Sequence, residues 1–134
     1  MACIVSGNEM TLSGDVGDYW SSDSFTSGEV FTALAQVEDD AGLVVYLNSG
    51  GGIATEGAAI HALFSRRSGT TDIVVDGIAA SAASLIAMAG DTVTMSAGAV
   101  MMIHDPTAFT VGNSDTHSKS IEGLEALATA YARV

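Results

Sequence analysis

Ser81 and His104 are the residues whose types could support nucleophilic catalysis. Ser81 stands between alanines at the start of an expected helix, where the helix dipole and the next backbone N–H would stabilise an oxyanion. His104 ends an apolar run further along the chain, and its imidazole could take the proton of a serine. Gly50–Gly52 follows another apolar run. Glycines there would let a substrate backbone approach closely and would leave N–H groups pointing outward.

Each of these features also has an ordinary structural explanation. A serine at a helix start can act as the N-cap, and Ser84 competes with Ser81 as the nucleophile. A histidine that ends an apolar strand can be a satisfied structural residue, and a glycine run can be a plain turn from strand to helix. The remaining histidines, which we expect on helices as surface or packing residues, are His61 and His117.

The elements that must position these residues alternate between strand and helix. The apolar runs 43–47 and 73–75 are typical of strands covered on both faces. The alternation predicts an α/β fold with a largely parallel sheet, in which ligand-binding groups lie at the carboxyl ends of the strands. Other expected strands are 10–12, 92–95 and 100–104, the last two as a hairpin-like pair, and the expected helices are 27–37, 55–69, 80–89 and one from about 113.

Helix boundaries and faces can be assigned from local signals. Thr26 and Glu29 form a capping box before an apolar run, and Gly69 is expected to be the C-cap of the second helix. That helix carries Ile60, Leu63 and Phe64 on one side. In the last helix a narrow apolar stripe is made by Ile121, Leu124, Ala128 and Tyr131.

The composition excludes several classes of protein. Four Lys+Arg against sixteen Asp+Glu give a net charge of −12, which disfavours binding to nucleic acid and to anionic membranes. The single cysteine excludes an internal disulfide and suits a reducing, cytoplasmic interior. The N-terminus lacks the pattern of a signal peptide. With 48% hydrophobic and only 15% charged residues, disorder is excluded, and we expect other subunits to cover part of the apolar surface.

The motifs together resemble the caseinolytic (Clp) serine peptidase family over about residues 10–134. The segments that carry the resemblance are Tyr46–Gly52, Gly77–Ser81 and Met102–Pro106. The chain is most similar to the bacteriophage branch, the Clp-like prohead or head-maturation proteases. The segments typical of that branch are Gly14–Gly17 followed by an aromatic loop, Asp76–Ser84, Ala87–Asp91 and again Met102–Pro106.

The resemblance implies an α/β Clp/crotonase-like fold of repeated ββα units. It implies Ser81 as nucleophile, His104 as general base, and an oxyanion hole from the backbone N–H groups of Gly52 and Ala82. It also implies that the helix from about Asn113 is the family's handle, through which subunits pack into rings. Neither a cofactor nor a metal is expected.

The chain departs from the family pattern in two places. Gly50 stands where the family usually has proline. The family's triad acid lies after the handle helix, and no acid of this chain matches it. Asp105 would point to the other face of a strand, and Asp115 and Glu122 belong to the handle region. We therefore expect either a single Clp-protease-like domain, 1–134, that lacks the family's C-terminal segment, or a site that works as a Ser–His dyad.

The function that the resemblance implies is that of a serine endopeptidase, a hydrolase that processes phage scaffold or capsid proteins during head maturation. The expected place is the bacterial or phage-infected host cytoplasm, and an AAA+ unfoldase is a candidate partner. The alternative is a non-catalytic, ring-forming Clp-like scaffold subunit. A Ser–Lys dyad would depend on the sole lysine, Lys119, in the handle region. An acyl-CoA enzyme would need cations for the CoA phosphates, and Arg66, Arg67, Lys119 and Arg133 are too few and too scattered.

Overall fold

The computed structural model describes residues 2–17 and 21–134, so Tyr19 and Trp20 of the expected aromatic loop lie outside the described residues. The chain divides into two compact units, Met1–Ile103 and His104–Val134. The elements of the first unit are β1 (Cys3–Ser6), β2 (Glu9–Ser13), β3 (Asp15–Val16), β4 (Ser24–Phe25), α1 (Ser27–Leu34), β5 (Leu43–Ser49), α2 (Ala54–Ser65), β6 (Thr71–Ala80), α3 (Ala82–Ala87), β7 (Thr92–Met95) and β8 (Val100–Met102).

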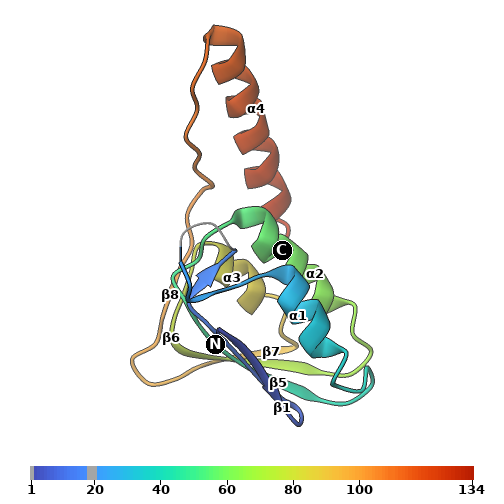
Figure 1. Cartoon of the computed structure of the whole chain (residues 1–134). Helices are drawn as coiled ribbons and strands as arrows, with labels where there is room; N and C mark the ends of the chain where they lie inside the picture. The colour runs from blue at the N-terminus through green and yellow to red at the C-terminus, as the bar shows by residue number, and fades with distance from the viewer. Residues whose placement is uncertain (1, 18–20) are drawn as a thin grey trace. The chain divides into compact units, whose positions relative to one another are not determined.

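A six-stranded sheet forms the centre of the first unit (Figure 1). Its strands follow the order β1-β2-β5-β6-β7, and β8 also pairs with β6. In this sheet the β1–β2 pair is antiparallel, and the pairs β2–β5, β5–β6, β6–β7 and β6–β8 are parallel. The prediction of an α/β fold with a largely parallel sheet is confirmed. Strands β3 and β4 form a separate parallel pair.

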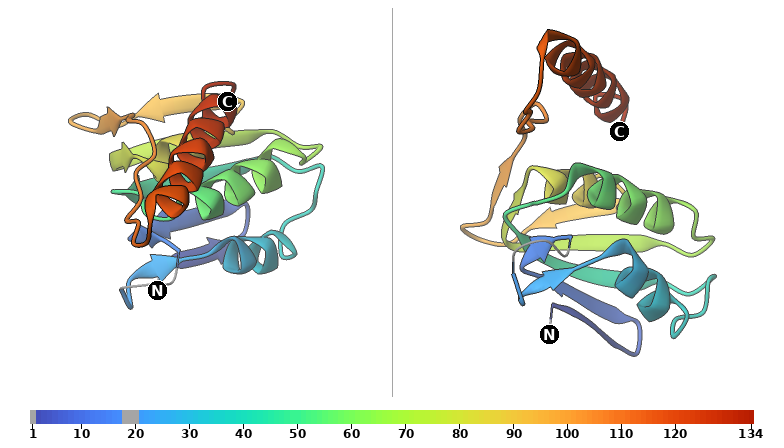
Figure 2. Two further views of the ribbon diagram at one scale, coloured as in Figure 1. Left: turned by 90° about the horizontal axis from the view of Figure 1, so that it is seen from above. Right: turned by 45° about the horizontal axis from the view of Figure 1, so that its top comes forward.

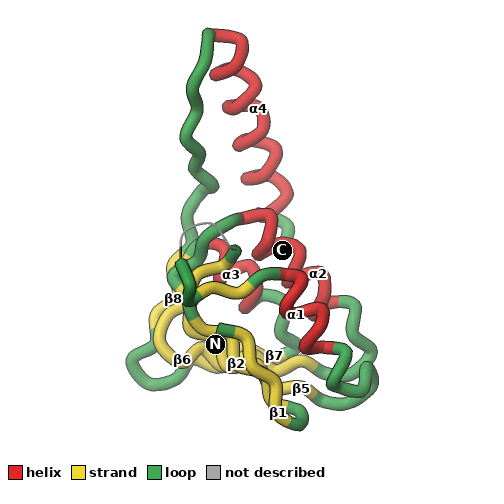
Figure 3. Tube along the Cα trace, viewed as in Figure 1, coloured by secondary structure: helices red, strands yellow, loops and turns green. Residues whose placement is uncertain are grey.

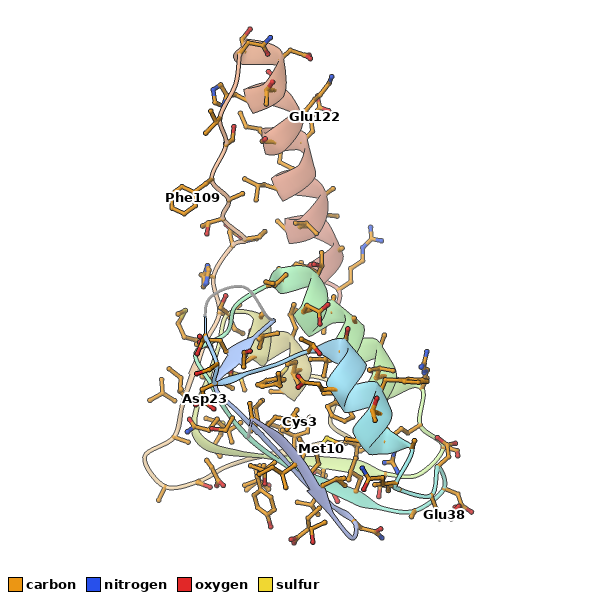
Figure 4. All side chains as sticks on the ribbon, in the orientation of Figure 1. Cys3, Met10, Asp23, Glu38, Phe109 and Glu122 are labelled. Atoms are coloured by element: carbon orange, nitrogen blue, oxygen red, sulfur yellow. The ribbon has the colours of Figure 1, made fainter. Side chains whose placement is uncertain are left out.

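The helices α1, α2 and α3 lie on one face of this sheet (Figure 2). Met10, which is labelled in Figure 4, lies fully buried between the sheet and these helices. In β5, Leu43, Val45 and Leu47 are buried, whereas the alternate residues are half-buried or exposed. The prediction that this strand is covered on both faces is therefore wrong for the first unit, because its helices form a single layer.

The capping box at the start of α1 is confirmed. The Thr26 side chain accepts a hydrogen bond from the Glu29 N–H, and the Glu29 carboxylate accepts one from the Thr26 N–H at 2.8 Å. The predicted C-cap of α2 is wrong, because that helix ends at Ser65 with Arg66 as its C-cap. Gly69 serves a different purpose: its N–H bonds to the Asp39 carbonyl, and a Cβ there would collide with the backbone of the 40–41 turn.

Strand β6 is longer than the apolar run that predicted it and pairs with two strands on the same edge. Its first part, Asp72–Val75, pairs with β7, and its last part, Ile78–Ala80, pairs with β8. The prediction that β7 and β8 form a hairpin-like pair is thus wrong, because both run parallel to β6. Strand β8 also ends at Met102, so His104 lies beyond the strand rather than at its last position.

The second unit holds one long helix, α4 (Ser114–Tyr131), which is labelled in Figure 3. Asn113 is its N-cap and accepts a hydrogen bond from the Thr116 N–H at 3.0 Å, as expected for a helix from about residue 113. The structure describes every residue of α4, and none of them is buried. Ile121 of the apolar stripe is 56% exposed. Among the described residues, no helix has the length and apolar character needed to cross a membrane.

Candidate active site

Ser81 joins the end of β6 to the start of α3 in an unusual backbone conformation. Its φ of 55° and ψ of −124° make it the only non-glycine residue with positive φ in the described part of the chain. Its N–H donates to the Met102 carbonyl at 2.9 Å, and its carbonyl accepts from the N–H and the hydroxyl of Ser84, at 2.9 and 2.6 Å. These hydrogen bonds hold the backbone of Ser81 in a region that favours glycine.

The Ser81 side chain does not cap α3, although Ser81 occupies the N-cap position. It makes no capping hydrogen bond, and the residue is half-buried. The competing serine, Ser84, is only 4% exposed, and its hydroxyl donates to the Ser81 carbonyl. The structure therefore leaves the Ser81 hydroxyl without the capping partner that its position suggested and gives the Ser84 hydroxyl a structural partner.

In the glycine turn after β5, some backbone N–H and carbonyl groups have hydrogen-bond partners and others do not. The Gly51 N–H donates to the Ser49 hydroxyl at 3.1 Å, and the Gly51 carbonyl accepts from the Val16 N–H at 2.9 Å. The Ile53 N–H in turn donates to the Val16 carbonyl at 2.8 Å. Between them, the Gly52 N–H has no acceptor among the described residues, and Gly52 is exposed. The N–H group of Gly52 is thus exposed and unpaired within the described part of the chain.

The glycine turn packs directly against Ser81. A Cβ on Gly51 would lie 2.6 Å from the Cβ of Ser81, so only glycine allows this approach. The first turn of α2 is equally close to α3, because a Cβ on Gly57 would lie 2.7 Å from the carbonyl oxygen of Ala82. The Ala82 N–H, at the first position of α3, also lacks an acceptor among the described residues. The unpaired N–H groups of Gly52 and Ala82 therefore belong to the two segments that meet at Ser81.

Asn48 and Ser49 are site residues that our sequence reasoning missed. The pairing of β5 with β6 shifts in register between Leu47 and Ser49. At this irregularity the Asn48 side-chain oxygen accepts a hydrogen bond from the Ile78 N–H at 3.2 Å. This contact ties the start of the glycine turn to the part of β6 that leads into Ser81. The sequence did offer a signal for these residues, because Asn48 and Ser49 are a polar pair between an apolar strand and a glycine run.

His104 is the first residue of the second unit and is exposed. Its Nδ1 pairs with the backbone carbonyl oxygen of Asp105 at 2.6 Å. Within residues 104–134, no carboxylate, including those of Asp115 and Glu122, is hydrogen-bonded to the imidazole. Because a carbonyl oxygen can only accept, this contact requires the proton on Nδ1 and leaves Nε2 as the acceptor of a neutral imidazole.

The other histidines lie on helices, as expected. His61 is on α2, where burial lowers its pKa, and its Nδ1 contacts the Ser65 hydroxyl at 3.4 Å. His117 is exposed on α4. In residues 2–17 and 21–134, no cluster of three or more His, Cys, Asp or Glu side chains is suited to hold a metal ion.

A comparison with known families agrees with the resemblance seen in the motifs. A family model described as Clp protease matches residues 4–132. A search of the curated proteins finds no match. Members of the matched family are in general serine peptidases, which are hydrolases, and they commonly form oligomeric rings. Because the match covers nearly the whole chain, and the chain is a mixed α/β structure around a central sheet, it belongs to the Clp protease family.

Proposed function

We propose that this chain is a serine endopeptidase in which Ser81 is the nucleophile and His104 is the general base. The observation that carries the proposal is the backbone of Ser81, held at positive φ between a strand and a helix with its side chain free of any cap. Strained residues of this kind persist at functional sites. A sharp strand-to-helix turn is also how other hydrolases expose a nucleophilic serine.

The role of His104 is supported by its position in the sequence, shortly after Met102. The Ser81 N–H bonds to the carbonyl of Met102, and His104 follows two residues later. Two residues span at most about 7 Å, so covalent connection alone limits how far the His104 backbone can lie from that carbonyl. The contact between Nδ1 and the Asp105 carbonyl supports the tautomer that a base needs, with Nε2 ready to take a proton. In this proposal the backbone carbonyl takes over the orienting role of a triad acid.

The mechanism follows from these roles. The Ser81 Oγ attacks the peptide carbonyl carbon, and its proton passes to Nε2 of His104. The carbonyl oxygen becomes an oxyanion, which the unpaired N–H groups of Gly52 and Ala82 stabilise. His104 then gives the proton to the leaving amine and releases the first product. Water, activated by the same imidazole, hydrolyses the acyl-enzyme and restores Ser81.

Labelling with a fluorophosphonate tests the nucleophile. The wild type should be labelled at Ser81, and Ser81→Ala should abolish both labelling and peptide cleavage. Ser84→Ala is the matched control, because it removes a nearby hydroxyl that is already bonded to the Ser81 carbonyl, and it should still be labelled. If labelling disappears in Ser84→Ala and persists in Ser81→Ala, the assignment of the nucleophile is wrong.

A second candidate function is that of a non-catalytic, ring-forming Clp-like subunit. It is favoured by one observation: no carboxylate of residues 104–134 is hydrogen-bonded to His104, and a histidine without its acid loses much of its activity. The labelling experiment decides between the two, since a scaffold subunit should not react.

The same proposal includes a repeated-unit architecture, a biological role and a partner protein. Repeated ββα units, with α4 as the handle, are supported by the motif segments; the order β5-α2-β6-α3 has a single strand before each helix. The role in phage head maturation in an infected cytoplasm, with capsid or scaffold proteins as substrates and an AAA+ unfoldase as a candidate partner, is supported by the motif segments alone.

Assembly into a ring through α4 is supported by the exposed stripe on that helix, which includes Ile121 at 56% exposure. Light scattering at micromolar concentration should show a closed oligomer. Leu124→Asp should dissociate it with little loss of helix content, and a wild type that is monomeric would exclude this mode of assembly.

A further inference from the structure

Val16 of β3 holds both peptide groups that flank the Cα of Gly52. Its N–H donates to the Gly51 carbonyl at 2.9 Å, and its carbonyl accepts from the Ile53 N–H at 2.8 Å. Val16 and Gly52 also form a parallel β-bridge. A Cβ on Gly52 would collide with the Val16 carbonyl, so the two backbones approach as closely as glycine allows.

The first of these peptide groups carries the unpaired N–H of Gly52. The Gly51 carbonyl and the Gly52 N–H belong to one peptide group, which is trans. In a planar trans peptide group the carbonyl and the N–H point in opposite directions. Because the Val16 N–H holds the carbonyl, the Gly52 N–H is directed away from Val16. It has no acceptor among the described residues and is therefore left for a ligand.

Val16 is itself held in place on the side away from the glycine turn. Its side chain is only 1% exposed. The N–H groups of its neighbours, Asp15 and Gly17, donate to the carbonyls of Asp23 and Phe25, at 2.9 and 2.8 Å. Successive N–H groups of β3 thus serve opposite sides, as they do in a strand between two partners. Strand β3 therefore links the glycine turn to β4.

The peptide group between Gly51 and Gly52 has few other restraints. The two glycines have φ values of 99° and 152°, and neither has a side chain that would limit rotation. The group also lies next to the nucleophile, because a Cβ on Gly51 would lie 2.6 Å from the Cβ of Ser81. Without the bond from Val16, rotation of this peptide would shift an oxyanion donor relative to the reacting hydroxyl. Such small displacements are expensive for catalysis.

We propose that Val16 is a positioning residue whose main chain directs the Gly52 N–H toward the substrate oxyanion. This inference rests on the proposed serine peptidase function. In this role Val16 acts through the peptide group of Gly51 and Gly52 rather than by contact with the substrate. Its contribution is made in the transition state, where the oxyanion forms, so it should appear in kcat and not in KM.

The test compares Val16→Pro with Asp15→Pro in steady-state peptide cleavage. Proline has no N–H, so Val16→Pro removes the bond to the Gly51 carbonyl, whereas Asp15→Pro removes the neighbouring bond of the same strand, to the Asp23 carbonyl. Loss of a whole oxyanion donor lowers kcat by about 100- to 1000-fold, and a misdirected donor should lose part of this. We expect Val16→Pro to lower kcat between about 10- and 100-fold, with KM changed less than about 2-fold.

Asp15→Pro should keep kcat within about 2-fold of the wild type, because the bond that it removes leads to β4 and not to the glycine turn. Equal kcat values in the two proline variants, or a rise in KM alone in Val16→Pro, would overturn the proposal.

An amide-to-ester replacement provides the second variant. If Val16→Pro does not give the wild-type circular dichroism spectrum, the α-hydroxy acid analogue of valine replaces Val16, which removes the N–H and keeps the buried side chain. The same replacement at Asp15 is the control. A loss of kcat at constant KM is again expected for the ester at Val16 alone, and equal kcat values in the two esters would overturn the role.

Fluorophosphonate labelling of the wild type separates this role from the proposed function. A wild type labelled at Ser81, with equal kcat values in the paired variants, defeats only the role of Val16. An unreactive wild type defeats the proposed function and this role with it.

Discussion

The backbone of Ser81 predicts that glycine at this position should stabilise the folded protein while removing the nucleophile. Ser81 has a φ of 55° and a ψ of −124°, a conformation that glycine adopts freely and that a residue with a Cβ adopts only at a cost. Ser81→Gly removes the Cβ and therefore the strain. Ser81→Ala removes only the hydroxyl and keeps the strain, so the two variants form a matched pair in which both are inactive.

The size of the effect follows from two opposing contributions. A non-glycine residue in a sparsely populated region costs about 1–3 kcal/mol, which Ser81→Gly recovers. Glycine also makes the unfolded chain more flexible, which costs about 0.5–1 kcal/mol. From the middle of both ranges, the expected net gain in the free energy of unfolding is thus about 1 kcal/mol. Ser81→Ala should lie within about 0.5 kcal/mol of the wild type, because the side chain makes no capping hydrogen bond that would be lost.

Urea unfolding followed by far-UV circular dichroism measures these differences. All three proteins must be compared at one concentration, since oligomerisation stabilises by mass action. The midpoint should be highest for Ser81→Gly, with the wild type and Ser81→Ala close together, and the slope should be the same for all. A Ser81→Gly variant that unfolds at or below the midpoint of Ser81→Ala would show that this backbone is not strained, and the main support for Ser81 as nucleophile would be lost.

Other substitutions test the contacts around the site. Gly57→Ala should destabilise by about 1–3 kcal/mol and slow the labelling of Ser81, because its Cβ would lie 2.7 Å from the Ala82 carbonyl oxygen. Gly123→Ala, in the open on α4, should instead stabilise that helix by about 1 kcal/mol in a thermal melt. Gly50→Pro should keep the wild-type cleavage rate and raise the unfolding midpoint. Gly50 has free space around it, follows an extended residue, and its N–H makes no hydrogen bond to a described backbone group. Burial raises the pKa of Cys3, so iodoacetamide should alkylate it more slowly at pH 8 than a free cysteine, with a rate that still climbs above pH 9; equal rates at pH 8 would contradict this.

Local signals in the sequence predicted most of the fold, and the errors have non-local causes. The capping box of Thr26 and Glu29 located the start of α1, because its hydrogen bonds lie within one turn. Strand β1 was missed, since Cys3–Ser6 becomes a strand by pairing with β2 rather than through a pattern of its own. The extension of β6 to Ala80 was missed for a similar reason, because its last residues pair with β8 beyond an irregularity in the sheet.

The candidate site could be predicted from residue types, although the details that position it could not. Ser81 and the glycine turn were visible as polar and glycine residues after apolar runs. Sequence alone could not separate a capping serine from a free one, because that depends on a backbone angle. The contact between Asn48 and Ile78 joins residues far apart in the chain. The free N–H of Gly52 depends on Val16, whose carbonyl takes the N–H of Ile53 and whose N–H holds the Gly51 carbonyl.

Close approach of backbones, more than any single side chain, gives this site its geometry. A Cβ would collide with the Ser81 side chain at Gly51, with Val16 at Gly52 and with Ala82 at Gly57. Three segments distant in sequence therefore meet through main-chain contacts, which a larger residue at any of these positions would separate. Main-chain donors held in this way need little reorganisation as charge develops on a substrate. The oxyanion site that we propose would therefore be built from backbone N–H dipoles, in a chain with only four Lys and Arg side chains.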